Sequence, residues 1–133
     1  MKSYRLFSVK KVVDLISTLM SSTDVKDSCK NIGKVFKHLG STYYIEPLEQ
    51  EWSSVSVTIS NERIVNIGLT FKQSYNLEEF DKEIGVIPIQ KNNNYDNVVV
   101  YTYRKPDFNL SIRIENSKDS LSNKLFKEMD ITF

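Results

Sequence analysis

The chain opens with two stretches in which apolar side chains recur at helical spacing. The first stretch predicts a helix over residues 9–20, with Ser8 as its N-cap. The second predicts a helix that begins near residue 22 or 23 and runs to residue 39, where Gly40 ends it. The apolar positions of the two helices are Val9, Val12, Val13, Ile16, Leu19 and Met20, then Val25, Cys29, Ile32, Val35, Phe36 and Leu39.

After Gly40 the period of the pattern changes from 3.6 residues to two. Apolar and polar residues alternate over 54–59 and again over 65–72, which is typical of strands with one buried face. The polar link at 60–62 is short enough for a hairpin between them. An earlier strand is predicted over 42–46, and Pro47 should end it.

A short helix and two further strands are predicted in the second half of the chain. The helix covers 77–84, with Asn76 as its N-cap and Gly85 as its stop. Strands follow over 97–104 and 108–115, joined by a turn that contains Pro106.

The last predicted element is a helix over 120–129, with Leu121, Leu125, Phe126 and Met129 on its buried side. The polar stretch 90–96 is interpreted as an exposed connection. The order ααβββαββα, with short links between consecutive strands, predicts an α+β fold. Its sheet should be mainly antiparallel, with about five strands and with helices on one face.

Composition indicates one globular domain over residues 1–133. The chain is 40% hydrophobic and 26% charged, and its length falls within the range of a single domain. Lys10, Lys11 and Asp14 interrupt the apolar residues near the start, so neither a signal peptide nor a membrane-spanning helix is predicted. Cys29 has no second cysteine to pair with, which suits a cytoplasmic protein.

Chemistry-bearing residues are scarce. His38 and Cys29 are the only residues of their types in the sequence. His38, near the end of the second predicted helix, is interpreted as a cation at the negative end of the helix dipole. Cys29 falls on the apolar stripe, where it should pack as a small hydrophobe. We therefore expect no catalytic group, no metal ligand set and no cofactor, and interpret the chain as a binding protein rather than an enzyme.

Charge is divided along the chain. Residues 1–40 carry eight basic and three acidic side chains, for a net charge of +5. Residues 41–85 carry eight acidic and three basic side chains, for a net charge of −5. One interpretation is internal complementarity, in which the basic helices pack beside the acidic segment. The other is an acidic patch that steers and holds a basic protein.

The acidic-patch hypothesis names eight partner-contact residues, in which Trp52 is an exposed anchor. They are Glu46, Glu49, Glu51, Trp52, Glu78, Glu79, Asp81 and Glu83. Nucleic acid is not the expected partner, because the lysines of the predicted helices have no exposed aromatic residues between them.

The run 63–71, followed by 76–80, Ile84 and Gly85, forms a strand, a turn, a short helix and a glycine. With the strand 99–104, this arrangement resembles small immunity proteins of bacterial toxin systems, including contact-dependent growth inhibition. The resemblance covers about half the chain. It implies a cytoplasmic protein that binds and neutralises a cognate toxin domain, often a nuclease, without catalysis.

An alternative interpretation comes from another class of function. A small α+β domain of this kind can hold a ligand, or act as an enzyme, in a pocket between helices and sheet. The polar groups assigned to such a pocket are Tyr101, Tyr103, Arg113 and Glu115.

Overall fold

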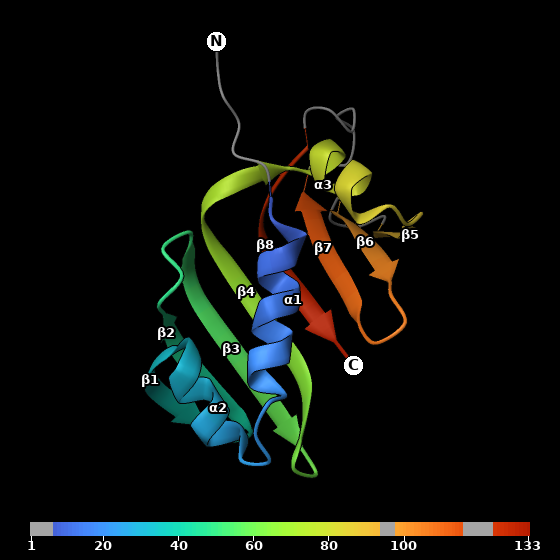
Figure 1. Cartoon of the computed structure of the whole chain (residues 1–133). Helices are drawn as coiled ribbons and strands as arrows, with labels where there is room; N and C mark the ends of the chain where they lie inside the picture. Colours follow the sequence, from blue (N-terminus) through green and yellow to red (C-terminus); the bar gives the residue numbers. More distant parts are fainter. Residues whose placement is uncertain (1–6, 94–97, 116–123) are drawn as a thin grey trace.

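A computed structural model gives the fold and describes residues 7–93, 98–115 and 124–133. In these ranges the chain forms three helices and eight strands (Figure 1). The helices are α1 (Val9–Leu19), α2 (Val25–Ile32) and α3 (Leu77–Ile84). The strands are β1 (Gly33–Leu39), β2 (Thr42–Pro47), β3 (Trp52–Ser60), β4 (Arg63–Asn76), β5 (Ile89–Asn93), β6 (Val98–Arg104), β7 (Asn109–Glu115) and β8 (Leu125–Thr132).

The eight strands form one antiparallel sheet in the order β1-β2-β3-β4-β8-β7-β6-β5. The predicted α+β class and antiparallel pairing are confirmed, whereas the predicted number of five strands is wrong. The order of elements also differs, because one predicted helix is a strand and another is half strand. The last strand, β8, lies between β4 and β7 and joins two groups of consecutive strands.

The three helices lie on one face of the sheet, as predicted (Figure 1). An aromatic cluster fills the space between them and the strands. Phe7 is at its centre, with ring centroids 5.2–5.7 Å from those of Tyr75, Phe71, Phe80 and Phe126. These rings join the segment just before α1 to α3, β4 and β8 in one buried core, in which edge-to-face pairs add to the free energy gained from burial.

Local capping signals in the sequence correctly placed two helices. The Ser8 hydroxyl accepts a hydrogen bond from the Lys11 backbone N–H at the start of α1 (3.4 Å). The Asn76 side chain accepts one from the Glu79 N–H at the start of α3 (3.1 Å), and Gly85 ends that helix with φ 68°.

The second predicted helix stops seven residues early. It ends at Ile32, and residues 33–39 form β1, which pairs with β2. Gly33 has no room for a Cβ atom beside the backbone of Glu46, so this junction requires glycine. Because β1 and β2 are joined through Gly40 at φ 56°, the glycine read as a helix stop is the turn of a hairpin.

The predicted C-terminal helix is wrong over 125–129, where the chain forms β8; residues 120–123 lie outside the described residues. Phe126 and Met129 are buried as expected, but Leu125 is 51% exposed. From Met129 onward, buried and exposed residues alternate, because β8 fills the centre of the sheet between β4 and β7.

Two smaller corrections concern strand boundaries and register. Residues 89–93 form β5 at the edge of the sheet, so the start of the stretch predicted as an exposed connection is a strand. In β4, Ile64 is buried and Val65 is 37% exposed, the reverse of the predicted alternation. An irregularity in the pairing with β3, between Thr58 and Ile59, shifts the register there, and from Ile67 onward the prediction is confirmed.

Candidate functional site

The eight predicted contact residues lie in four places. Glu49 and Glu51 belong to the segment between β2 and β3, the four acidic residues of 78–83 belong to α3, Glu46 lies on β2, and Trp52 begins β3. The first two groups flank the N-terminal half of α1, on either side of it. This end of the molecule is named the α1–α3 acidic surface and comprises Glu49, Glu51, Glu78, Glu79, Asp81 and Glu83.

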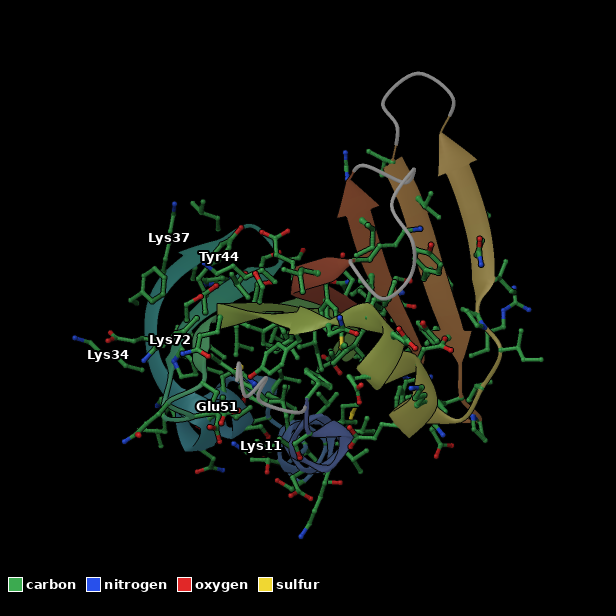
Figure 2. All side chains as sticks on the ribbon, turned by 90° about the horizontal axis from the view of Figure 1, so that it is seen from above. Lys11, Lys34, Lys37, Tyr44, Glu51 and Lys72 are labelled. Atoms are coloured by element: carbon green, nitrogen blue, oxygen red, sulfur yellow. The ribbon has the colours of Figure 1, made fainter. Side chains whose placement is uncertain are left out.

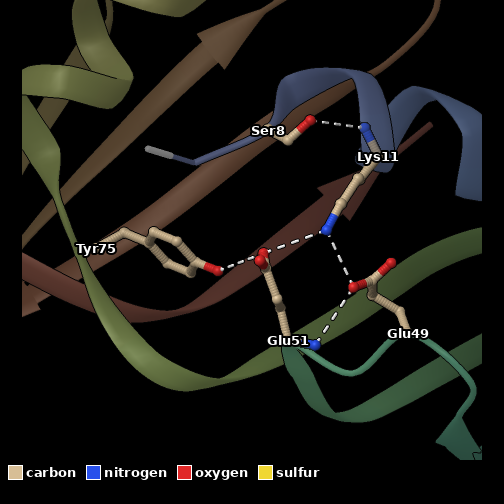
Figure 3. Close-up of polar contacts among 5 residues, drawn as sticks. All are labelled: Ser8, Lys11, Glu49, Glu51 and Tyr75. Atoms are coloured by element: carbon tan, nitrogen blue, oxygen red, sulfur yellow. Dashed lines mark hydrogen bonds and ion pairs between the residues drawn. The ribbon is translucent and has the colours of Figure 1, made fainter. Parts of the chain in front are cut away.

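Lys11 of α1 binds both carboxylates of the β2–β3 segment (Figure 3). Its Nζ lies 3.0 Å from Glu49 Oε1 and 3.3 Å from Glu51 Oε2. Glu49 Oε1 also accepts a hydrogen bond from the Glu51 backbone N–H (3.3 Å), and Glu51 Oε2 accepts one from the Tyr75 hydroxyl (3.1 Å). The predicted internal complementarity between the basic N-terminal and acidic middle segments is therefore present here.

The same ion pair shifts the pKa values of its partners in opposite directions. Partial burial raises the pKa of Glu49, but the hydrogen bonds from Lys11 and the backbone outweigh it, so the pKa lies below its ordinary value. The hydrogen bond to Glu49 raises the pKa of Lys11 against the opposing effect of desolvation. Lys11 thus offsets one of the two negative charges that this segment contributes.

An open hollow of about 500 Å³ lies where α3 meets the start of α1. Phe7, Ser8, Glu79, Lys82 and Glu83 line it. The Val9 backbone N–H donates to Glu83 Oε1 (3.3 Å), which places a negative charge at the positive end of the α1 dipole.

Two other acidic residues of α3 have internal partners. Glu78 pairs with Lys82 one turn later, at 3.4 Å. Asp81 Oδ1 accepts a hydrogen bond from the hydroxyl of the buried Tyr103 (2.9 Å), and burial together with this bond raises the pKa of Tyr103. Glu79 and Glu83 are the two acidic residues of α3 that are exposed and line the hollow.

Trp52 and Glu46 do not join this surface as predicted. Trp52 is only 6% exposed and belongs to the core, so its interpretation as an exposed anchor is wrong. Trp52 stands across from Phe71 in the pairing of β3 with β4, and both residues are buried. Glu46 points to the opposite face, where it stands across from Lys34 of β1.

The four residues assigned to the alternative pocket are not brought together in the described residues. Tyr101 and Tyr103 are buried on the helix-covered face, where Tyr101 accepts a hydrogen bond from Lys124 Nζ at 2.7 Å. Arg113 is exposed on the other face, across from Val100. The side chain of Glu115 lies outside the described residues.

His38 and Cys29 both have structural positions. His38 lies on β1 and stacks on Tyr43 with ring centroids 4.0 Å apart, so its predicted role at a helix terminus is wrong. Cys29 is fully buried, and burial, followed by the charge of Asp24, raises the pKa of its thiol to about 11. Within the described ranges, no three side chains of His, Cys, Asp and Glu gather in a metal-binding arrangement.

Sequence reasoning missed the uncovered face of the sheet. A hollow of about 260 Å³ lies there across β2, β3, β4 and β8, floored at Gly68 and bordered by hydroxyl and acidic side chains. Its polar lining consists of Tyr44, Ser54, Ser56, Thr70, Glu128 and Asp130. Desolvation, and then the charge of Glu128, raise the pKa of Asp130. The alternation of Ser54 and Ser56 with buried valines was the available signal.

Comparisons with known proteins show the fold and leave the family open. No family model matches the chain, and no curated protein matches it. The chain is similar to the crystal structure of a DUF4309 family protein, YjgB, from Bacillus subtilis, with a TM-score of 0.51 and 10% identity. The likeness covers 80% of this chain and 76% of that one. At this identity it indicates a shared fold and carries no function over.

None of the helices in the described ranges has the length and apolar character needed to cross a membrane.

Proposed function

We propose that this protein is an immunity protein that binds and neutralises a cognate toxin domain of basic charge, without catalysing a reaction. The resemblance of 63–85 to such proteins motivates the class, and the α1–α3 acidic surface provides a place for the contact. The proposal includes a cytoplasmic location, which the unpaired Cys29 suits.

The observation that carries the proposal is the hollow between α1 and α3. Glu79 and Glu83 lie one helical turn apart on α3, and both line this hollow. It is open to solvent and about 500 Å³ in volume, which is enough for a lysine or arginine side chain of a partner. Carboxylates at its border supply the hydrogen-bond acceptors that such a side chain needs.

The charge of the surface supports steering of a basic partner. Helix α3 carries four carboxylates and one lysine, Lys82, for a net charge of −3. Glu49 and Glu51 with Lys11 add a further −1. A concentrated negative potential raises the encounter rate with a positively charged surface, whereas individual rim charges add little to the affinity.

Growth rescue tests the proposal directly. The immunity hypothesis predicts that a gene next to the one for this chain encodes the cognate toxin. Expression of that adjacent gene should arrest bacterial growth, and co-expression of this chain should restore it. A Glu78→Lys/Glu79→Lys variant should rescue poorly, because it reverses two charges of the α1–α3 acidic surface that should attract the toxin. Neither carboxylate has a buried partner in the described ranges, so we expect the fold to persist. The matched control is Glu62→Lys, an exposed residue of the β3–β4 turn, which should rescue like the wild type. Absence of toxicity, or no rescue by the wild type, contradicts the immunity assignment, and full rescue by the Glu78→Lys/Glu79→Lys variant contradicts binding through the acidic surface.

A further inference from the structure

The uncovered face of the sheet carries lysine and aromatic side chains close together. The helix predicted to run to residue 39 would have placed Phe36 on its apolar side, away from the lysines. Because residues 33–39 form a strand, Lys34, Phe36 and Lys37 lie along one edge of the sheet. The pairing of β1 with β2 is irregular between Val35 and Lys37, and such a bulge turns two successive side chains to the same face. Phe36 is consequently 57% exposed beside two exposed lysines.

Tyr44 of β2 completes this group. Its ring centroid lies 6.5 Å from that of Phe36, and Lys37 Nζ lies 5.7 Å from the Tyr44 ring centroid. Figure 2 shows Lys34, Lys37 and Tyr44 on the β1–β2 side of the molecule, away from Lys11 and α1. We name the four residues Lys34, Phe36, Lys37 and Tyr44 the lysine–aromatic surface.

The two ammonium groups are available to a ligand. Among the residues that the structure describes, no ion pair engages Lys34 or Lys37. Glu46 is the carboxylate paired across from Lys34 in the register, and the group keeps a net charge of +1 with Glu46 included. On the far side, Glu128 and Asp130 of β8 border the hollow that Tyr44 also lines, which limits an anionic ligand to the β1–β2 side.

Aromatic rings beside ammonium groups on the uncovered face of a sheet match the chemistry of a nucleic acid strand. Aromatic faces stack on bases, and lysines neutralise phosphates. Bases are free to stack on side chains only when they are unpaired, and an acidic polypeptide would use the lysines without the rings. We propose that the lysine–aromatic surface binds single-stranded nucleic acid, with Phe36 and Tyr44 stacking on bases and the lysines holding the backbone. This proposal is independent of the toxin-binding function.

Fluorescence anisotropy with a labelled oligouridylate of about 12 nucleotides tests this binding. Phe36→Leu and Tyr44→Leu keep apolar side chains but remove the rings, and each should weaken binding roughly fivefold or more. The matched control is Phe133→Leu, which removes a 43% exposed ring elsewhere and should change nothing. Raising salt from about 0.05 M to about 0.2 M should weaken binding roughly sevenfold if two phosphates are neutralised.

Charge variants keep the test valid if a ring variant loses stability. Lys37→Gln should make the slope of log K against log salt shallower by about 0.7, whereas Lys10→Gln on the exposed side of α1 should leave it unchanged. Glu46→Gln should tighten binding, an effect that partial unfolding cannot produce.

Four results would overturn the proposal. They are no binding by the wild type at low salt, equal affinity for a duplex, equal affinity for polyglutamate, and ring variants that bind as the wild type does. Equal binding of polyglutamate with no effect of the rings would assign the surface to an acidic protein instead. The Glu78→Lys/Glu79→Lys variant should bind the oligonucleotide normally, so failure of one proposal does not imply failure of the other.

Discussion

Gly33, the first residue of β1, lies against the carbonyl oxygen of Glu46 on β2 so closely that no Cβ atom fits between them. A Cβ on Gly33 would also fall 2.8 Å from the Cα of Pro47, and backbone atoms of a paired strand cannot move aside easily. Gly33→Ala should therefore lower the free energy of unfolding by about 1–3 kcal/mol. Urea unfolding, followed by the fluorescence of Trp52, measures this free energy, because the buried Trp52 is the only tryptophan in the sequence.

The control for this prediction is Gly40→Asn. Gly40 has φ 56° and open space around its Cα, and asparagine adopts this conformation more readily than other residues with a side chain. We expect a smaller loss of stability than for Gly33→Ala, because only the left-handed backbone conformation, and no neighbouring atom, opposes the new side chain. Equal losses of stability in the two variants would contradict the claim that the close backbone contact at Gly33 is what requires glycine there.

Ile67 and Leu69 are neighbours on the buried face of β4, with 0% and 1% of their surfaces exposed. Each change to alanine should lower the free energy of unfolding by about 2–5 kcal/mol, because a cavity remains at the centre of the sheet. Val65→Ala, at a 37% exposed position of the same strand, should lose less. A loss under about 0.5 kcal/mol at both buried sites would contradict the assigned face of β4.

The ion pair of Lys11 and Glu49 predicts a pH dependence of stability. Because the folded state lowers the pKa of Glu49, the stabilisation is present above the pKa of the unfolded chain and is lost as the pH falls through the folded value. Glu49→Gln should lower stability at pH 7 by about 0.2–1 kcal/mol, as expected for a partly exposed pair. The difference between Glu49→Gln and wild type should shrink toward acid pH in urea titrations at several pH values. A constant difference would contradict the ion pair.

The buried thiol of Cys29 should be unreactive in the folded protein. Burial raises its pKa to about 11, so little thiolate forms near pH 8, and the sulfur is also shielded from reagents. Labelling with a chromogenic disulfide should therefore be slow in buffer and fast in urea above the unfolding midpoint. Rapid labelling without denaturant would show that α2 opens locally.

Elements with local start and stop signals could be predicted from the sequence. Ser8 and Asn76 cap the helices where expected, and the polar link around Asn61 closes the β3–β4 hairpin with positive φ angles. The alternation from Ile67 to Phe71 identified the buried face of β4. In each case the determining contacts lie within a few residues of one another in the chain.

The elements whose type was predicted incorrectly depend on contacts between distant parts of the chain. Residues 33–39 have apolar spacing that fits a helix, but pairing with β2 and the close contact at Gly33 select a strand. Phe126 and Met129 are three residues apart, also as in a helix, yet β8 completes the sheet between β4 and β7. The burial of Trp52 and the ion pair of Lys11 likewise follow from the tertiary fold, which local patterns do not encode.

The measurement that tests the central claim most directly is the association rate with the product of the adjacent gene. Electrostatic steering requires this rate to fall as salt rises from about 0.01 M to about 0.1 M, because the screening length shortens from about 30 Å to about 10 Å. Glu78→Lys/Glu79→Lys should slow association, while Glu62→Lys should not. An association rate that is independent of salt and equal in all three proteins would contradict binding through the α1–α3 acidic surface.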